Sequence, residues 1–319
     1  MKEDVSRRNF LRGTLTAVAV AGFDVHLRGW VSAAELASGR ATLADAFPHF
    51  RGQLHFDDAS LTAAADDFGH AIHRRPLAVL KPAAVSDVVR LLQFTSRHGI
   101  QVAARGQGHS TLGQAQVAAG VVIDLSTLAA IHEVNDHDAL VDAGVRWSEL
   151  LRQTLPKGIA PTVFNDYIEL SVGGTLSVGG VGSQSFRRGA QVDNVLELTV
   201  VTGRGELMTC SPSRHRQLFD AVRSGLGQFG VIVQARVRLV PALPKTRYYK
   251  LTYDDLSVFL ADLRLLVQDG RFDTVQGFVN VLTAARIPGW DYTIEATKNF
   301  SPRHEPDDAA LLAGLSPSV

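Results

Sequence analysis

The stretch 104–114, with the sequence Ala-Arg-Gly-Gln-Gly-His-Ser-Thr-Leu-Gly-Gln, constrains the fold and function of this chain more than any other. The apolar residues 102–104 predict the end of a buried strand, and Gly106 and Gly108 after it allow positive φ and close approach of the backbone to a ligand. Successive N–H groups in such a turn bind anions, typically a phosphate or pyrophosphate. The stretch alone leaves two interpretations open: a ligand-binding turn, or a tight turn that carries His109 on the surface.

The glycines of this stretch do not form the fingerprint of a Rossmann fold. Gly106-Gln107-Gly108 lacks the third glycine, and no helix-forming segment begins directly after it. Arg105 either adds positive charge to an anion site or pairs with another residue in a structural role. The pattern therefore indicates a ligand-binding loop of another kind.

Charge and cysteine content exclude several classes of partner and site. The 319 residues carry 32 basic and 32 acidic side chains, so the chain lacks the basic excess expected for binding nucleic acid or an anionic membrane, and a small-molecule partner is predicted. Cys210 is the single cysteine, which excludes an internal disulfide and a cysteine-based metal cluster. His70 and His73 have a spacing that suits metal ligands, but no third ligand follows with similar spacing, and a surface position is predicted for both.

The amino terminus has the form of a twin-arginine export signal, predicted over residues 1–33. Ser6-Arg7-Arg8-Asn9-Phe10-Leu11-Arg12 precedes the apolar run 13–23, which is too short to span a bilayer, and 31–33 offers a small-residue cleavage site. The alternative is an amphipathic helix with a chance arginine pair. Export would place the protein in the periplasm or outside the cell, and this pathway commonly carries proteins with a cofactor already bound.

Hydrophobic periodicity predicts an α+β fold. Ser86 is the expected N-cap of the first helix of the domain. Up to residue 241, strands are predicted at 76–80, 121–124, 131–134, 139–141, 194–202, 206–210 and 231–240, and helices at 86–97, 147–155 and 218–222. Beyond it, strands are predicted at 248–253, 272–282 and 292–297, and helices at 256–267 and 309–315. Strands and helices in this order predict a sheet with helices on one side.

Pro241 and Pro244 break the pattern and mark a domain boundary. Residues 34–75 form a polar lead-in, 76–241 the first domain and 242–319 a partial second domain. The second domain is small for an independent unit, so it is expected to be part of a larger sheet domain.

A second glycine-rich block covers 171–182, with the sequence Ser-Val-Gly-Gly-Thr-Leu-Ser-Val-Gly-Gly-Val-Gly. Such small residues are expected to pack poorly as core and to let the backbone run against a flat or charged ligand. A flexible loop is the alternative. Asp166 lies shortly before the block, where an acid would adjoin a ligand cleft or serve only as a turn residue.

Four ordered motifs resemble cytokinin dehydrogenase, a branch of the vanillyl-alcohol oxidase type of FAD enzymes. They are 104–115, the segment 166–177 that contains Asp166-Tyr167 and Ser171–Ser177, Asn194–Leu198 and Gly225–Ile232. The resemblance runs from about Pro76 to Val240 and continues more weakly to about Leu315. It implies a PCMH-type FAD-binding domain of two α+β subdomains with FAD between them, followed by a partial α+β substrate domain.

The resemblance also implies roles for individual residues. His109 would carry the FAD covalently, and Asp166 would accept a proton from, or hydrogen-bond, the substrate N–H while the adjacent carbon gives hydride to the flavin. The residues that would contact the FAD are Ala104, Arg105, Gly106, Gln107, Gly108, His109, Ser110, Gln114, Ser171, Ser177, Val181 and Ile232.

Two features depart from the family pattern. Gln276 in Phe272-Asp273-Thr274-Val275-Gln276-Gly277 stands where the family has a second acid; a neutral amide can orient a substrate but cannot share a proton with Asp166. Family members also continue well beyond residue 319, so a truncated chain is an expectation.

These features predict an exported FAD oxidoreductase that oxidises a C–N or C–O bond of a small substrate, with oxygen or a quinone reoxidising the flavin. Two alternatives stay open. One is a sugar or alcohol oxidase of the same superfamily, and the other is a flavin-binding protein without turnover.

Overall fold

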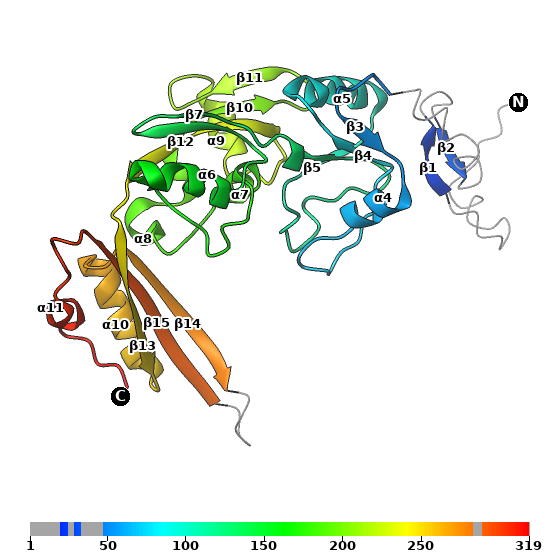
Figure 1. Cartoon of the computed structure of the whole chain (residues 1–319). Helices are drawn as coiled ribbons and strands as arrows, with labels where there is room; N and C mark the ends of the chain where they lie inside the picture. Colours follow the sequence, from blue (N-terminus) through cyan, green and yellow to red (C-terminus); the bar gives the residue numbers. More distant parts are fainter. Residues whose placement is uncertain (1–19, 25–28, 33–46, 283–288, 319) are drawn as a thin grey trace, which may run out of the picture.

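The computed structural model describes residues 20–24, 29–32, 47–282 and 289–318. The predicted α+β class is confirmed: the chain forms sheets of three to six strands with helices packed against them. Figure 1 shows the part coloured blue to cyan beside the green and yellow part, with the orange and red part below. The β-strands β1 (Val20–Asp24) and β2 (Gly29–Ser32) form a separate antiparallel pair.

The first subdomain is a four-stranded sheet in the order β3-β4-β6-β5. The parallel strands are β4 (Ala78–Lys81), β6 (Val121–Asp124) and β5 (Val102–Arg105), and β3 (Gln53–His55) pairs antiparallel to β4. The helix α4 (Asp58–Ala64) precedes β4. Because ligands bind beyond the carboxyl ends of parallel strands, the loop that follows β5 is a natural ligand position.

Helix α5 (Val85–His98) connects β4 to β5. Its buried residues Val88, Leu91 and Leu92 recur at helical spacing, and Gly99 ends it in the left-handed region with φ of 67°. The predicted N-cap at Ser86 is wrong: the N-cap is Ala84, two residues earlier, and the helix begins at Val85. The carboxylate of Asp87 accepts the N–H groups of Ala83 and Ala84 at 3.0 and 3.3 Å, and so satisfies the helix start in place of a serine hydroxyl.

The second subdomain is a mainly antiparallel sheet in the order β11-β10-β12-β8-β7, with a further strand on β12. The strands are β7 (Ile131–Val134), β8 (Asp138–Asp142), β9 (Ile159–Pro161), β10 (Val195–Val201), β11 (Leu207–Cys210) and β12 (Val231–Pro241). Along β12, Val233, Ala235 and Val237 are buried, Arg236 is half-buried and Arg238 is exposed, an alternation that the Val/Arg pattern of this predicted strand indicates.

Four helices accompany this sheet: α6 (Trp147–Thr154), α7 (Val172–Val178), α8 (Ser185–Arg188) and α9 (Arg216–Val222). Short 3-10 turns occur at Leu125–Thr127, Leu155–Lys157 and Gln191–Asn194. The two subdomains share one hydrophobic core, which contains Leu80 and Leu91 of the first and Val141 and Val233 of the second.

Helix α7 corrects the expectation that the glycine-rich block packs poorly. Val172 and Leu176 are fully buried, and the Trp147 indole N–H donates to Thr175 Oγ at 2.8 Å. A Cβ atom on Gly173 would lie 2.6 Å from Ala143 Cβ, so the glycine lets the helix approach β8 closely. The small residues therefore serve packing on one side of the helix and leave the other side accessible.

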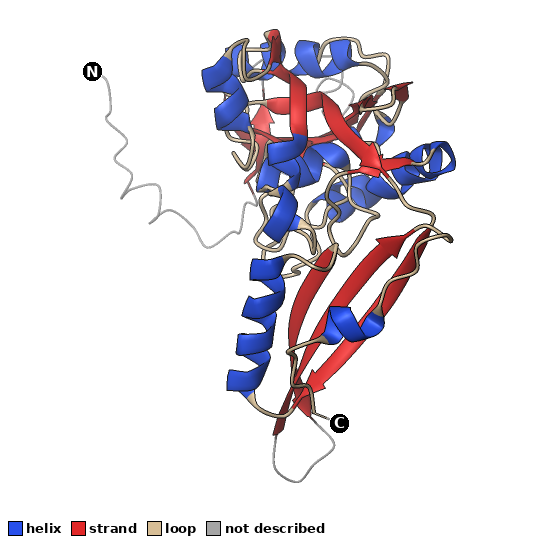
Figure 2. Cartoon of the chain, turned by 90° about the vertical axis from the view of Figure 1, so that its left-hand side faces the viewer, coloured by secondary structure: helices blue, strands red, loops and turns tan. Residues whose placement is uncertain are grey.

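The carboxyl-terminal part has its own sheet and core. Its strands pair antiparallel in the order β13-β15-β14, with bounds Lys245–Tyr253, Gly289–Phe300 and Thr274–Leu282. Helix α10 (Leu256–Asp269) runs along this sheet, as Figure 2 shows, and α11 (Asp308–Leu312) follows β15. The core contains Phe259, Leu266 and Ile294. Strand β12 ends at Pro241 and β13 begins at Lys245, on either side of the predicted domain boundary.

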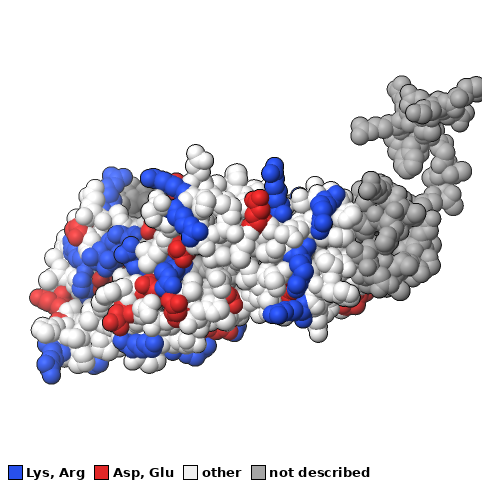
Figure 3. Space-filling model, turned by 90° about the horizontal axis from the view of Figure 1, so that it is seen from above, with Lys and Arg blue, Asp and Glu red and all other residues white. Residues whose placement is uncertain are grey.

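The twin-arginine stretch 6–12 lies outside the described residues. Among the residues that are described, no helix combines the length and hydropathy that a bilayer crossing requires. Basic and acidic side chains are interspersed on the face shown in Figure 3.

Candidate functional site

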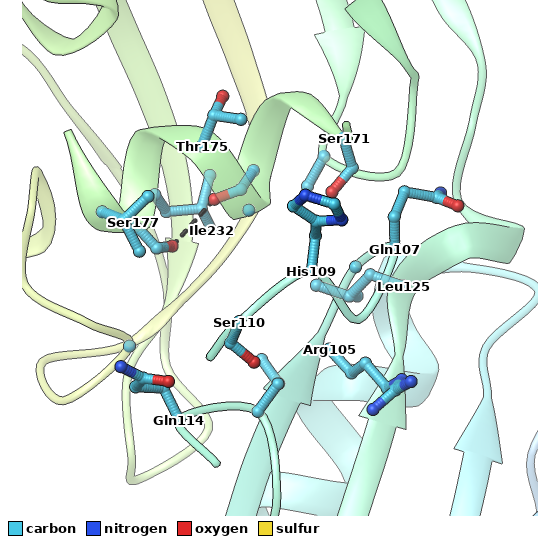
Figure 4. A pocket seen from close by; sticks show the side chains of 18 of the residues that line it. Arg105, Gln107, His109, Ser110, Gln114, Leu125, Ser171, Thr175, Ser177 and Ile232 are labelled. Carbon is cyan, nitrogen blue, oxygen red and sulfur yellow. Dashed lines mark hydrogen bonds between the residues drawn. The ribbon is translucent and has the colours of Figure 1, made fainter. Parts of the chain in front are cut away.

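A cleft lies between the two subdomains and is lined by three segments. They are the loop after β5, the first turns of α7 with the residues before it, and the glycine-rich loop before β12 (Figure 4). The space between the atoms of the cleft, counted together with the open solvent at its mouth, is about 900 Å³. The three segments are far apart in the sequence, so the fold brings together what three separate motifs encode.

All but one of the predicted cofactor-contact residues line this cleft. Those that do are Ala104, Arg105, Gly106, Gln107, Gly108, His109, Ser110, Gln114, Ser171, Ser177 and Ile232. Val181 is the exception: its side chain is exposed and its carbonyl accepts Asn165 Nδ2 at 2.9 Å. Gly179 and Gly180 after α7 have φ of 110° and 70° and turn the chain away, which carries Val181 out of the cleft.

The loop after β5 contacts the start of α7 directly. Gly108 has φ of 69°, and a Cβ atom on Gly106 would lie 2.1 Å from Ser171 Oγ. Within the described part of the chain, the backbone N–H groups of 106–111 donate no hydrogen bond. Successive unpaired N–H groups beside glycine backbone form a site suited to the oxygens of an anion.

Arg105 takes the structural role of the two that its sequence left open. Its Nη1 donates to the carbonyl of Asp66 at 2.6 Å, and Figure 4 shows the guanidinium directed away from Ser177 and Ile232. Burial lowers the pKa of Arg105, against the opposing effect of Asp124 and other nearby carboxylates. The guanidinium of Arg105 therefore ties the loop to Asp66 and points away from the centre of the cleft.

Ser171 presents an unsatisfied polar atom to the cleft. The residue is 2% exposed, and its Oγ has no hydrogen-bond partner among the described residues although it stands at the N-cap of α7. Buried hydroxyl groups are normally paired. A ligand oxygen or nitrogen in the cleft would supply the missing partner.

His109 is exposed at the tip of its loop, and Figure 4 shows its ring directed toward Ser171. The ring lies between two aromatic side chains. Its centroid is 4.0 Å from that of Phe68 and 5.2 Å from that of Tyr167, each with planes inclined by 25°. A nucleophilic imidazole therefore stands at the mouth of the cleft in a restrained orientation.

The two predicted catalytic residues do not line the cleft. Asp166 is exposed in the loop between β9 and α7, next to the Tyr167 that stacks on His109. Gln276 lies on β14, where its partner across the sheet is Glu295 of β15. Asp166 is thus adjacent in sequence to Tyr167, whose ring stacks on that of His109. Gln276 belongs to the carboxyl-terminal sheet.

Several lining residues were not predicted from the sequence. They are Ala115, Leu125, Ala143, Leu170, Gly173, Gly174, Thr175, Val178, Leu226, Gly227, Gly230 and Val231. The glycine-rich signal at 225–230 could have indicated the last four of these. Leu125, Ala143 and Leu170 are ordinary apolar residues, and nothing in their local sequence distinguishes them from core.

A comparison with protein families matches part of the chain to a family that binds FAD. Residues 76–211 match the family model described as FAD binding domain, a range that contains both the His109 loop and α7. Over this range the chain is similar to an FAD binding domain. The unpaired N–H groups, the glycine backbone and the orphan hydroxyl of Ser171 fit the polar part of such a cofactor.

Individual proteins similar to this chain include an oxidoreductase and a cytokinin dehydrogenase. The chain is 46% identical over 264 residues to an uncharacterized oxidoreductase of the fasciation locus of Rhodococcoides fascians, covering 83% of this chain and 60% of that one. It is 42% identical over 251 residues to cytokinin dehydrogenase 3 of Oryza sativa subsp. japonica, covering 76% of this chain and 47% of that one. The chain is therefore similar to cytokinin dehydrogenase 3 and to an uncharacterized oxidoreductase, and it spans about half to three fifths of the length of these relatives.

The fold is shared with a solved structure, 6-hydroxy-D-nicotine oxidase from Arthrobacter nicotinovorans. The TM-score is 0.69 at 25% identity, covering 85% of this chain and 60% of that one. This match supports the predicted PCMH-type α+β architecture.

Proposed function

We propose that this protein is an FAD-dependent oxidoreductase that removes hydride from a carbon beside nitrogen or oxygen in a small substrate. The observation that carries the proposal is the cleft itself, which is lined by the loop 106–110 with its unpaired N–H groups, by Ser171 with its unpaired hydroxyl, and by His109. Bound FAD would supply the two-electron acceptor for the hydride. Dioxygen or a quinone would serve as the final acceptor of the two electrons and two protons.

His109 is proposed to hold the FAD covalently. Its exposed imidazole at the cleft mouth supports this assignment. Attachment would replace the imidazole N–H of His109 and one flavin C–H bond by a single C–N bond. Dioxygen would be the two-electron oxidant and would be reduced to hydrogen peroxide.

Asp166 is proposed to accept the proton of the substrate N–H or O–H while hydride leaves the adjacent carbon. Its carboxylate is solvent-accessible and adjoins the Tyr167 that stacks on His109, so a substrate at the cleft mouth could reach it. A positioned base of this kind contributes about 10²- to 10⁴-fold to a rate. Gln276 is proposed to orient the substrate through its amide.

The test of the cofactor assignment uses protein precipitated with acid. We expect yellow colour and flavin absorbance to stay with the wild-type pellet, and His109→Ala to release the flavin into the supernatant. His215→Ala is a matched control, because His215 lies at the start of α9 and does not line the cleft. A colourless wild-type protein that binds no added FAD would contradict the proposal.

The substrate class is tested by anaerobic bleaching of the flavin. The similarity to cytokinin dehydrogenase 3 supports a cyclic or planar amine, so isoprenoid adenines should bleach the flavin and sugars should not. Bleaching by sugars alone would favour the alcohol oxidase reading. A flavin that no substrate bleaches would favour a binding protein without turnover.

We also propose export through the twin-arginine pathway to the periplasm or beyond. The support is the sequence 6–12 followed by the apolar run 13–23. A reporter fused after residue 33 should be exported, and the double change Arg7→Lys and Arg8→Lys should retain it in the cytoplasm. Equal export of both fusions would reject the pathway.

A further inference from the structure

The segment Asp66–Gly69 lies before the matched domain yet is hydrogen-bonded to the His109 loop. The N–H of Phe68 donates to the carbonyl of Gly108 at 3.0 Å, and the N–H of Gly69 donates to the carbonyl of Ser110 at 3.2 Å. These two bonds flank His109 on either side. The backbone of the segment therefore runs beside the histidine and fixes the position of its Cα.

Asp67 strengthens this contact from inside the protein. The residue is 2% exposed, and its carboxylate accepts the hydroxyl of Ser110 at 3.1 Å and the N–H groups of Gly113 and Gly69 at 2.8 and 3.1 Å. A buried carboxylate is tolerated only when its oxygens are paired in this way. Asp67 thus joins its own segment to the His109 loop, and Phe68 has little freedom at its backbone.

Phe68 then orients the ring of His109. Its side chain is 59% exposed, so the stacking contact with His109 is not part of the buried core. The ring lies on the imidazole at 4.0 Å between centroids and 25° between planes, closer than Tyr167 on the other face at 5.2 Å. An offset ring pair of this geometry restricts rotation of the imidazole about its χ angles.

We propose that Phe68 is a positioning residue that holds the His109 ring in the orientation required for bonding to FAD. The inference rests on the proposed covalent attachment. It extends the cofactor site to a segment that the FAD-binding domain match does not include. Phe68 acts through His109, and Asp67 holds the backbone from which Phe68 extends.

The test follows covalent attachment in flavin-free protein after addition of FAD, measured as acid-stable flavin against time. Phe68→Ala should slow attachment about 3- to 10-fold, as expected for the loss of one ring contact. Phe68→Tyr keeps the ring and should attach FAD at the wild-type rate. Leu207→Ala, which removes a similarly exposed apolar side chain from β11, should also leave the rate unchanged.

Two further readouts separate positioning from general stability. Thermal unfolding of Phe68→Ala should shift by no more than about 2 °C, since exposed side chains contribute little to stability. Initial non-covalent FAD binding, followed by fluorescence quenching, should change less than twofold. Attachment by Phe68→Ala at the wild-type rate, or slow attachment by Phe68→Tyr as well, would overturn the inference. Absence of acid-stable flavin from the wild type would instead reject the covalent attachment itself.

Discussion

Gly106 is a point of close approach between the loop after β5 and Ser171 at the start of α7. A Cβ atom there would collide with Ser171 Oγ at 2.1 Å, although the backbone of Gly106 does not adopt positive φ. The glycine is therefore required by the space available at this contact and not by its own conformation. The same contact holds the Ser171 hydroxyl in its buried, unpaired position.

Gly106→Ala is expected to push the start of α7 away from the β5 loop and to weaken FAD binding. Overpacking of this kind costs about 1–3 kcal/mol, which corresponds to a loss of affinity of roughly 5- to 150-fold. Titration of flavin-free protein with FAD measures the effect. Gly203→Ala is the control, since a Cβ atom at Gly203 meets nothing within 4 Å. Equal affinity of both variants would show that the contact with Ser171 does not shape the site.

Asp166→Asn keeps the size of the side chain and removes its basicity. We expect the rate of anaerobic flavin reduction to fall by about 10²- to 10⁴-fold while the flavin content is unchanged. Stopped-flow absorbance of the purified flavoprotein measures this directly. Asp193→Asn, a substitution in the turn before β10, should reduce the flavin at the wild-type rate. A fully active Asp166→Asn protein would exclude this carboxylate as the base.

At the scale of elements, α5 depends on one buried carboxylate. Asp87 is fully buried and accepts the N–H groups of Arg51 and Gly52 at 2.9 Å each, as well as Nη2 of Arg90 at 2.6 Å. Burial alone would raise the pKa of Asp87, but the hydrogen bonds from Arg51, Arg90 and the helix start outweigh it and lower the pKa. The carboxylate thus joins the helix start to the segment before β3.

This lowered pKa gives the stability a defined dependence on pH. The folded protein keeps Asp87 ionised to a lower pH than the unfolded chain does, so its contribution is full above about pH 4 and is lost as the pH falls further. Asp87→Asn should lower the free energy of unfolding by about 3 kcal/mol at pH 7, and by progressively less below pH 4. Urea unfolding at several pH values tests this. A difference between the two proteins that stays constant down to pH 2 would be inconsistent with the ionised network.

The sequence predicts those elements whose pattern comes from burial of apolar side chains, and it misses a helix that depends on tertiary packing. The alternation along β12 and the apolar spacing in α5 come from burial, and the structure confirms both. The helix α7 was missed because glycines and hydroxyl residues disfavour a helix locally, while the buried Val172 and Leu176 and the contact with Ala143 stabilise it through tertiary packing.

Some residues of the candidate site could likewise be predicted from the local sequence, and others depend on the fold. The glycine-rich loop 104–108 carries its own turn chemistry, so its position at the cleft could be predicted from sequence. Val181 was placed by motif alone, and two glycines with positive φ direct it outward. Phe68 has no signal in its local sequence, because its contact with His109 depends on hydrogen bonds across the fold.

At the scale of the whole molecule, the described chain has separate large cores on either side of Pro241. One joins both subdomains of 47–241, and the other lies between α10 and the β13-β15-β14 sheet. FAD is expected to contact only the first of these units. FAD binding should therefore stabilise the unit 47–241 more than the carboxyl-terminal unit.

Calorimetry tests this expectation on flavin-free protein. We expect two unfolding transitions, and FAD at 100 times its Kd should stabilise only the first unit, by about 2.7 kcal/mol. For a unit of this size, the corresponding increase in Tm is roughly 5–10 °C. A common shift of both transitions would indicate that the two units unfold together.

A crystal structure of the protein with FAD tests the central claim most directly. We expect the pyrophosphate to lie against the N–H groups of 106–110, Ser171 Oγ to gain a hydrogen bond to the cofactor, and continuous density to join the flavin to His109. FAD found elsewhere on the molecule, or a cleft closed by packed side chains, would contradict the assignment.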